Sequence, residues 1–493
     1  MRPFKQFSRG AALTAIVWGC VGSVGAAAEL ERQPYIQQLG ANQATVVWTT
    51  TEEADGTLAY GTDRLSLDQE VVGAASAMMA LEATDLMPAT RYYYAVQVDG
   101  KVLAGGDEDH YFETAPETGT RAKFRAWVLG DSGTGKESQA AVLDAMTGFT
   151  GETPLDLILH MGDIAYPDGT ESEMTDNHFG VYGDILTRTV FWPTYGNHDA
   201  VSADADLQTG PYFEAFVLPT DGEIGGVASQ TEAYYSFDFA NVHFIVLDSS
   251  ESDHSSDGTM MTWAAADLAA TTQEWIVAFW HHPPYSKGSH DSDEETSLVE
   301  MREGVMPIME SGGVDVVLTG HSHSYERSYL VDGAYASPST TEGIVDENDG
   351  DPSSDGPYEK EAGITANGGT VVLVAGHSGQ SVSGDGDHPV MAVSEFEYGS
   401  VVLDVHENRL EITNVRWDEQ ITDRVALVKG EGLILYNPIS GDAFQYAEPH
   451  TIEWSTVGDI ATVDLHYSCD GGASWLVIEE AISNENQYEW TVP

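Results

Sequence analysis

The residues of this chain that could do chemistry gather in five short polar clusters, each directly after an apolar run. The clusters lie at residues 129–133, 162–166, 196–199, 280–283 and 320–323. The runs 124–129, 155–160 and 314–318 are typical of buried strands, and 275–280 is a mixed run that also predicts a strand. Because open α/β sheets place their sites at the carboxyl ends of strands, we expect the clusters to meet in one polar pocket.

The clusters supply seven side chains that could bind metal ions: Asp131, Asp163, Tyr166, Asn197, His281, His321 and His323. All are oxygen or nitrogen donors, which suit iron, zinc or manganese better than copper(I) or an iron–sulfur cluster. Seven donors are too many for one ion, but with one bridging carboxylate they make two sets. Hydrolysis at phosphorus uses such a pair of ions, about 3.5–4 Å apart. The pattern therefore predicts a dinuclear hydrolytic site.

The same clusters resemble the sequence blocks of the purple acid phosphatases, a family of the calcineurin-like metallophosphoesterases. The family's D-x-G, G-D-x-x-Y, G-N-H-[DE], V-x-x-H and G-H-x-H blocks stand here in order, at 131–133, 162–166, 196–199, 278–281 and 320–323. Ala278 replaces the valine of the fourth block. The resemblance extends over about residues 30 to 420 and implies a catalytic domain built as a two-sheet α/β sandwich.

The resemblance also implies how the donors divide between two ions. One ion would take Asp131, Tyr166 and His323, the other Asn197, His281 and His321, and Asp163 would bridge them. Most of the wider superfamily has a histidine two residues after the first aspartate, whereas this chain has Gly133 there and Tyr166 instead. A phenolate stabilises trivalent iron, so we expect Fe(III) in the Tyr166 site and a coloured protein. Zn(II), Fe(II) and Mn(II) all remain candidates for the second site.

The implied activity is that of a metal-dependent phosphoric monoester hydrolase, in which a metal-bound hydroxide attacks phosphorus. His198 is expected to reach the phosphate, with Asp199 orienting it. His290, nine residues after His281, stands where the family has a substrate-binding histidine that can protonate the leaving alkoxide. The family often has a second histidine next to it. This chain has Asp291 there, and we expect Asp291 to pair with His290.

Other functions fit part of the pattern. A phosphodiesterase or a nucleotidase could use the same two ions. A non-catalytic, metal-dependent surface-binding protein is disfavoured, because it would not need every donor. Residues 130–136 fit the first seven positions of a Walker A loop, but Glu137 stands where that motif needs a hydroxyl for magnesium. The glycines of this segment more simply allow a sharp turn after the strand.

Residues 1–28 are typical of a signal peptide, with a basic start, a small apolar run and an A-x-A cleavage site. Cys20 leaves lipoprotein processing open, although the bulky Trp18 disfavours it. We therefore expect a secreted protein, extracellular or periplasmic, with no membrane span after signal removal. Its 20 Lys+Arg against 80 Asp+Glu give a net charge of −60, which excludes nucleic acid or an anionic membrane as a general partner. A small-molecule phosphoester is the substrate that the resemblance implies. The oligomeric state stays open.

Three units are expected after the signal peptide. Residues 29–116 predict a β-sandwich, and the Leu86-x-Pro-x-Thr-x-Tyr92 pattern resembles the corner of fibronectin type III domains. The catalytic domain is expected at 121–423, with an acidic solvated loop at 335–369. Residues 430–493 predict a small C-terminal β-sandwich that weakly resembles accessory modules of secreted enzymes.

Overall fold

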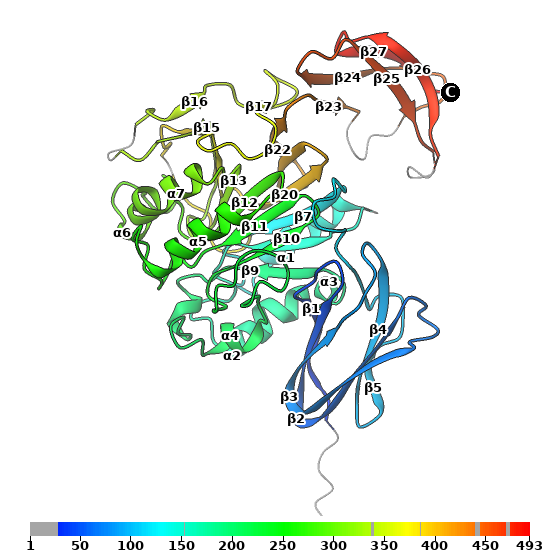
Figure 1. The fold of residues 1–493 in the computed structure, drawn as a ribbon, viewed down its shortest axis with the longest axis vertical. Coiled ribbons are helices and arrows are strands. Elements are labelled where there is room, and N and C mark those ends of the chain that lie inside the picture. The colour runs from blue at the N-terminus through cyan, green and yellow to red at the C-terminus, as the bar shows by residue number, and fades with distance from the viewer. Residues whose placement is uncertain (1–27, 152, 337–339, 385, 439–443, 470–473) are drawn as a thin grey trace, which may run out of the picture.

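The computed structural model describes residues 28–151, 153–336, 340–384, 386–438, 444–469 and 474–493. Figure 1 shows three units: an N-terminal β unit in blue, a central α/β unit, and a C-terminal β unit in red. Residues 1–27 of the predicted signal peptide, with Cys20 among them, lie outside the described ranges. No helix in the described part of the chain is long and apolar enough to span a bilayer.

The N-terminal unit is one six-stranded, hydrogen-bonded sheet with the order β1-β2-β4-β5, to which β3 adds on β2 and β6 on β4. Its strands are β1 (Leu30–Gln37), β2 (Ala44–Gly61), β3 (Gln69–Ala83), β4 (Arg91–Val98), β5 (Lys101–Gly105) and β6 (Tyr111–Glu113). The hydroxyl of Tyr92 accepts a hydrogen bond from the backbone N–H of Met87 at 3.0 Å, which is the contact of a tyrosine corner. The unit is therefore β-rich as expected, while its assignment as fibronectin type III-like stays a prediction.

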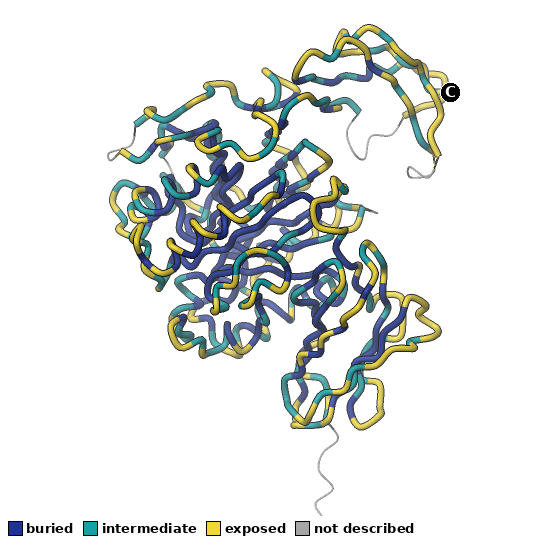
Figure 2. The backbone as a smooth tube through the Cα atoms, viewed as in Figure 1, coloured by how far each residue is buried: buried dark blue, intermediate teal, exposed yellow. Residues whose placement is uncertain are grey.

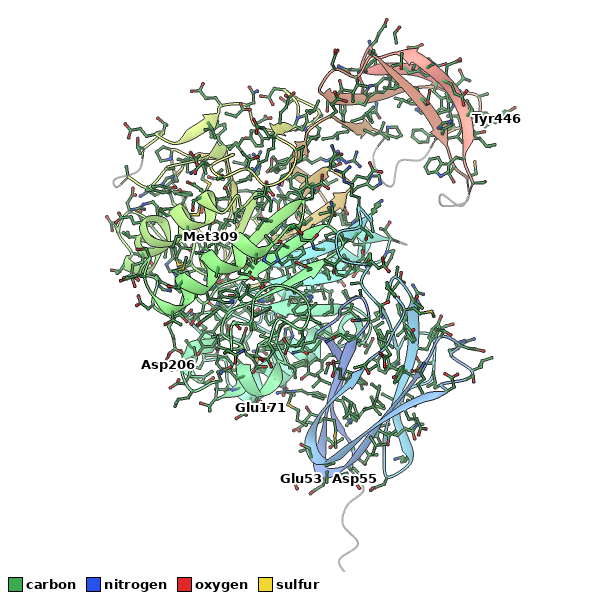
Figure 3. The ribbon with its side chains drawn as sticks, viewed as in Figure 1. Glu53, Asp55, Glu171, Asp206, Met309 and Tyr446 are labelled. Atoms are coloured by element: carbon green, nitrogen blue, oxygen red, sulfur yellow. The ribbon has the colours of Figure 1, made fainter. Side chains whose placement is uncertain are left out.

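Buried hydrogen bonds dock strand β1 onto the central unit. The Tyr35 hydroxyl donates to the carbonyl of Ala215 at 2.5 Å, and the Gln37 side chain donates to the carbonyl of Phe191 at 2.7 Å. Glu171, labelled in Figure 3 where the two units meet, pairs with Arg32. Because buried polar groups need partners, these contacts fix the N-terminal unit on one side of the central unit.

The central unit contains two seven-stranded sheets. The first has the order β17 (Tyr358–Lys360), β22 (Ile421–Lys429), β21 (Arg409–Arg416), β20 (Gly399–His406), β7 (Phe124–Leu129), β8 (Leu157–His160), β9 (Val190–Pro193). The second has the order β10 (Tyr235–Phe239), β11 (Val242–Val246), β12 (Trp275–Phe279), β13 (Val316–Thr319), β18 (Val371–Ala375), β14 (Tyr325–Ser328), β19 (Met391–Glu395). A short ribbon pairs β15 (Leu330–Val331) with β16 (Ile344–Asp346).

Helices and helical turns connect these strands. They are α1 (Glu137–Thr150), α2 (Glu171–Glu173), η1 (Met174–Phe179), α3 (Gly180–Leu186), η2 (Asp199–Val201), α4 (Pro211–Ala215), α5 (Thr259–Ala270), α6 (Thr296–Glu300), η3 (Met301–Val305) and α7 (Met306–Ser311). Helix α1 packs on β20 and β21, and α5 contacts α7. Glu137, the residue that argued against a Walker A loop, is the first residue of α1.

Aromatic side chains join the two sheets into one core. Trp192 of β9 stacks on Phe237 of β10 with ring centroids 4.0 Å apart, and Phe124 of β7 lies 4.9 Å from Phe239. Figure 2 shows the buried backbone, in dark blue, running through the middle of the central unit. The α/β core of two packed sheets agrees with the fold expected for the catalytic domain.

Parallel strands bring the predicted polar clusters to common edges. Strands β7, β8 and β9 are parallel neighbours in the first sheet, and β11, β12, β13 and β18 are parallel neighbours in the second. The runs 124–129, 275–280 and 314–318 form β7, β12 and β13 as predicted. Strand β9 was not predicted, because it is only four residues long and ends in a proline.

The central unit extends beyond its predicted end at residue 423. Strand β22 pairs with β21 from Ile421 to Val428, so the boundary falls after β22. The carboxylate of Asp423 also receives two hydrogen bonds from Arg327 of the central unit, at 2.6 and 2.9 Å. The boundary at 423 is therefore corrected.

Part of the predicted solvated loop at 335–369 is structured. It contributes β16 and the edge strand β17. Lys360 of β17 and Lys429 of β22 both bind the buried carboxylate of Asp315, at 2.6 and 2.7 Å. These buried ion pairs connect the edge of the first sheet to the start of β13. No pattern in the loop sequence predicted them.

The C-terminal unit consists of a three-stranded and a two-stranded sheet. The strands are β23 (Gly432–Asn437), β24 (Pro449–Val457) and β27 (Gln487–Thr491) in the first sheet, and β25 (Thr462–Tyr467) and β26 (Leu476–Ser483) in the second. A small core of Ile452, Trp454 and Val463 lies inside it. Much of this unit is exposed or half-buried in Figure 2, as a small module requires. Cys469 is exposed.

The core of the second sheet contains a buried histidine between two carboxylates, which predicts a pH-dependent stability. His243 Nδ1 lies 2.8 Å from Asp238, and Nε2 lies 2.8 Å from Asp267. Burial alone would lower the pKa of His243, but the hydrogen bonds and negative charges of both carboxylates outweigh it and raise the pKa from 6.5 to about 9. The charged form is therefore favoured by folding. Its stabilisation, on the order of 3 kcal/mol, is fully present below pH 6.5 and lost as pH rises through 9.

We expect the melting temperature of the wild-type protein to exceed that of His243→Gln by more at about pH 6 than at about pH 9.5. Thermal unfolding of both proteins at the two pH values measures this difference. Subtracting the melting temperature of the variant cancels the pH effects of the other titratable groups, which both proteins share. An equal difference at both pH values would contradict a charged His243.

Candidate metal centre

Each predicted donor lies just beyond the carboxyl end of a strand. Asp131 follows β7, Asp163 follows β8, Asn197 follows β9, His281 follows β12 and His321 follows β13. The first three strands are parallel in one sheet, and the last two are parallel in the other. The pocket expected from the sequence is therefore formed where the ends of both packed sheets meet.

Sharp backbone turns aim these side chains into the pocket. Asp131, Asp163 and His321 have φ angles of 56°, 54° and 63°, in the left-handed region that costs energy for residues with a Cβ. The motif glycines make room for the turns. A Cβ on Gly196 would lie 2.3 Å from the carboxylate of Asp163, and one on Gly320 would lie 2.6 Å from that of Asp131. Strained backbone turns that the surrounding structure holds in place are typical of functional sites.

The first donor group consists of Asp131, Tyr166 and His323. The Tyr166 hydroxyl lies 3.0 Å from Asp131 Oδ1 and 3.4 Å from His323 Nε2, and His323 Nε2 lies 3.6 Å from Asp131 Oδ1. The same hydroxyl donates to Asp163 Oδ2 at 2.8 Å. Three donors from three different strand ends therefore face one point, with Asp163 at its edge.

The second donor group consists of Asn197, His281 and His321. Asn197 Oδ1 lies 2.9 Å from His281 Nε2 and 2.9 Å from His321 Nδ1. His281 Nε2 also lies 3.5 Å from Asp163 Oδ1, so the two oxygens of Asp163 face the two groups. His281 Nδ1 lies 2.8 Å from the carbonyl of Met161, and donation to that carbonyl leaves Nε2 free to bind a metal.

The charged groups of the pocket favour the binding of cations. Asp131 and Asp163 are buried, and in the described part of the chain neither forms an ion pair with a lysine or arginine. Burial would raise the pKa of Asp131, but the His323 hydrogen bond, the charges of His281 and His323, and the Tyr166 hydroxyl together lower it. Burial and the two carboxylates raise the pKa of Tyr166 well above 10. Two buried carboxylates and a phenol without a lysine or arginine are a donor set suited to highly charged metal ions.

The structure places the predicted phosphate-binding His198 at the edge of this pocket. Its backbone N–H donates to Asp163 Oδ1 at 2.8 Å. Its ring Nδ1 lies 2.5 Å from the carbonyl of Pro167, and Nε2 lies 4.0 Å from Asp163 Oδ2. The ring is partly exposed, with 37% of the side chain accessible, so it can contact a bound substrate.

The expected contact between Asp199 and the His198 ring is not formed. Its buried carboxylate accepts hydrogen bonds from the backbone N–H groups of Ile164 and Gly196, at 3.1 and 3.0 Å. Those two residues flank Asp163 and Asn197. Asp199 therefore fastens the loop after β8 to the loop after β9, and its predicted role is corrected from orienting His198 to holding the donor loops together.

His290 is also paired differently from the prediction. Asp291 was expected to be its partner, but Asp291 forms an ion pair with Lys287. The partner of His290 is Glu295, whose two oxygens lie 3.0 and 2.9 Å from Nδ1. The chain turns between them, since the backbone N–H groups of both Glu294 and Glu295 bind the carbonyl of Asp291. Adjacency in sequence misled the prediction, because the turn reverses the chain.

Sequence reasoning missed a second loop that supports the donors. Residues 376–383 follow β18, a strand that was predicted, but they were not recognised as part of the site. The N–H of Gln380 donates to the carbonyl of Asp131 at 2.9 Å, and that of Ser383 donates to the carbonyl of His323 at 3.1 Å. The signal was present, because Gly376 and Gly379 surround a histidine and a serine directly after an apolar run, as in the other clusters.

A histidine next to a predicted donor was also overlooked. His282 is buried, its Nδ1 lies 2.9 Å from Ser249 Oγ, and its ring packs against that of His321 with centroids 4.4 Å apart. His281, His282 and His321 together could hold a metal ion by their spacing. The hydrogen bond to Ser249 holds the His282 ring, which packs against His321 and supports it.

Comparisons with known proteins agree with this geometry. A family model described as calcineurin-like phosphoesterase matches residues 124–325. Purple acid phosphatase 15 of Arabidopsis thaliana is 27% identical over 275 residues, 50% of this chain and 49% of that protein. Purple acid phosphatase 23 of the same plant is 30% identical over 272 residues, 49% of this chain and 56% of that protein. A phosphoenolpyruvate phosphatase of Allium cepa is 27% identical over 250 residues, 49% and 48% of the two chains. The chain spans about half the length of these curated relatives.

The fold is shared with a solved structure of a purple acid phosphatase from yellow lupin (Lupinus luteus) seeds. The TM-score is 0.65 at 16% identity, covering 80% of this chain and 74% of that chain. The structure of PhoD matches with a TM-score of 0.55 at 13% identity, covering 80% and 88%. The chain therefore contains a calcineurin-like phosphoesterase domain with the α/β core of the metallophosphoesterases, and purple acid phosphatases are among its homologues.

The two donor groups predict the metal stoichiometry of a variant. Asn197→Ala removes the oxygen shared by His281 and His321, so we expect bound metal to fall from two ions per chain to about one. Asn241→Ala is the matched control, since Asn241 is buried but its side chain donates to Glu274 and to the carbonyl of Glu407 instead. Elemental analysis of both purified variants measures the content. Two ions retained in Asn197→Ala would remove Asn197 from the donor set.

Proposed function

We propose that this protein is an exported phosphomonoesterase that works with two metal ions held by the seven donors. The observation that carries the proposal is the position of Asp163. One of its oxygens lies 2.8 Å from the Tyr166 hydroxyl and the other lies 3.5 Å from His281 Nε2, so a single carboxylate faces both donor groups. A shared carboxylate between two donor groups is the arrangement of two-metal hydrolytic sites.

The proposed ions differ between the two groups. For the group of Asp131, Tyr166 and His323 we propose Fe(III), because a phenolate ligand such as Tyr166 would stabilise a trivalent ion. For the group of Asn197, His281 and His321 we propose Zn(II), Fe(II) or Mn(II), which suit one amide oxygen and two imidazoles. Two such cations, when bound, supply a nucleophile from water at neutral pH and neutralise charge on the phosphoryl oxygens.

The chain's own residues then orient the substrate and move a proton. His198, held at Nδ1 by the carbonyl of Pro167, would contact a phosphoryl oxygen through Nε2. His290, held at Nδ1 by Glu295, would give the proton on Nε2 to the oxygen of the leaving alcohol. Asp199 keeps the loops that carry Asp163 and Asn197 in register, so both donor groups stay aligned during the reaction.

A monoester is the substrate class that the relatives favour. Several relatives are purple acid phosphatases, and another is a phosphatase of phosphoenolpyruvate, which is itself a phosphomonoester. Export is proposed from the sequence pattern of residues 1–28, and a net charge of −60 would keep an exported protein soluble. The described residues of the two β-rich flanks include none of the seven donors, and we propose a supporting role for the N-terminal unit, which is docked through β1.

Hydrolysis of p-nitrophenyl phosphate and of bis(p-nitrophenyl) phosphate by the metal-loaded protein tests the proposal. We expect a higher kcat/KM on the monoester, loss of activity after dialysis against a chelator, and recovery when metal is returned. His281→Ala should lower kcat/KM by at least about 10²-fold, because it removes charge stabilisation in the transition state. His388→Ala is the control, since His388 is a buried histidine outside the donor groups. Turnover that survives metal removal, or a clear preference for the diester, would refute the proposed function.

A further inference from the structure

Glu295 lies between two histidines that the proposed function assigns to different tasks. Its carboxylate is 2.9 Å from His290 Nδ1 and 3.6 Å from His321 Nε2. The rings of His290 and His321 are in tilted contact, with centroids 3.9 Å apart and planes at 34°. One carboxylate therefore faces one nitrogen of each ring in this pair.

His321 needs such a partner. Its Nδ1 faces Asn197 in the second donor group, at 2.9 Å, so Nε2 points away from that group. Nε2 is buried and has no hydrogen-bond partner within 3.5 Å among the described residues, and the Glu295 carboxylate is close enough to become its partner after a small shift. A histidine that binds a metal through one nitrogen usually donates the other N–H to a carboxylate or carbonyl, which fixes the ring and makes it a better ligand.

The loop around Glu295 is built to hold this carboxylate in place. The backbone N–H of Asp291 donates to Glu295 Oε1 at 3.1 Å, and the N–H of Glu295 donates back to the carbonyl of Asp291 at 3.0 Å. Glu295 is also the N-cap residue of helix α6, and its carbonyl accepts a hydrogen bond from the N–H of Val299. The acidic neighbours have other partners, because Lys287 pairs with both Asp291 and Asp293.

A buried network fastens the same loop to the strand that follows His321 and His323. The carboxylate of Glu326, on β14, accepts from the N–H of Lys287 at 3.0 Å and from the hydroxyls of Ser286 and Ser324 at 2.5 and 3.0 Å. The hydroxyl of Ser289 accepts from the N–H of His323 at 2.8 Å. The loop that carries His290 and Glu295 is thereby held against the loop that carries His321.

We propose that Glu295 is a positioning residue that serves both histidines: it orients His321 for the second metal ion and His290 for proton transfer to the leaving group. The inference rests on the proposed function, and it adds to that function a link between metal affinity and leaving-group protonation. By holding Nδ1 of His290, Glu295 makes Nε2 the atom that reaches the substrate. By accepting the Nε2 proton of His321, it keeps Nδ1 free to bind the ion.

The test compares Glu295→Gln with Glu294→Gln in the full-length protein. Both variants remove one negative charge from neighbouring positions, but Glu294 is exposed and contacts neither histidine. The first measurement is the affinity for the second ion, by titrating metal-depleted protein with Zn(II) against a competing chelator. We expect Glu295→Gln to weaken it by about 10–100-fold and Glu294→Gln to leave it near wild type.

The second measurement is kcat/KM on an alkyl phosphate and on p-nitrophenyl phosphate, at metal concentrations that saturate every variant. Glu295→Gln should lower the rate on the alkyl phosphate by about 10²-fold and on p-nitrophenyl phosphate by much less, because p-nitrophenolate leaves without a proton. His290→Ala should show the same leaving-group dependence without the loss of metal affinity. Adding Glu295→Gln to His290→Ala should then cost little more on the alkyl phosphate.

Only a change in both measurements supports the proposal. A loss confined to metal affinity, a loss confined to the alkyl phosphate, or no loss in either would overturn it. Equal losses in Glu294→Gln would mean that the loss of one negative charge in this loop causes the effect, and would also overturn the proposal. If the wild-type protein hydrolyses neither phosphate, the proposed function fails, while the Zn(II) titration still decides whether Glu295 supports His321. Melting curves of the metal-depleted variants show whether each is folded.

Discussion

Two buried carboxylates without a lysine or arginine partner are the constraint on which this structure depends. Asp131 and Asp163 are held at the carboxyl ends of β7 and β8, and in the described ranges only histidines form ion pairs with them. Burying two such charges side by side is costly unless cations compensate them. The arrangement of parallel strands in two packed sheets brings histidine, tyrosine and asparagine donors to the same place, and the metal ions proposed there would supply the missing positive charge.

The precision of the site comes from backbone groups as much as from the donors. His281 is oriented by the carbonyl of Met161, His198 by the carbonyl of Pro167, and the loops of Asp163 and Asn197 by the carboxylate of Asp199. The left-handed turns at Asp131 and Asp163 need neighbours without side chains, which explains the glycines of the motifs. These hydrogen bonds and turns hold the donor side chains in position before any ion binds.

Sequence could predict what depends on strand ends and residue types. The seven predicted donors lie together because each follows an apolar run, and parallel strands place such positions at a common edge. Contacts made through turns could not be predicted in this way. Asp291 is adjacent to His290, yet Glu295 reaches it because the chain reverses between them. Asp199 follows His198, yet it bonds to backbone amides of two other loops. The predicted boundary at Asp423 falls inside β22, because its pairing with β21 and the contact of Asp423 with Arg327, 96 residues away, leave no local pattern in the sequence.

The most direct test of the central claim is a crystal structure of the metal-loaded protein with anomalous diffraction at the iron and zinc edges. We expect two peaks about 3.5–4 Å apart, one beside Asp131, Tyr166 and His323 and the other beside Asn197, His281 and His321, with Asp163 between them. Iron should occupy the Tyr166 position. A single ion, or two ions that Asp163 does not bridge, would contradict the central claim.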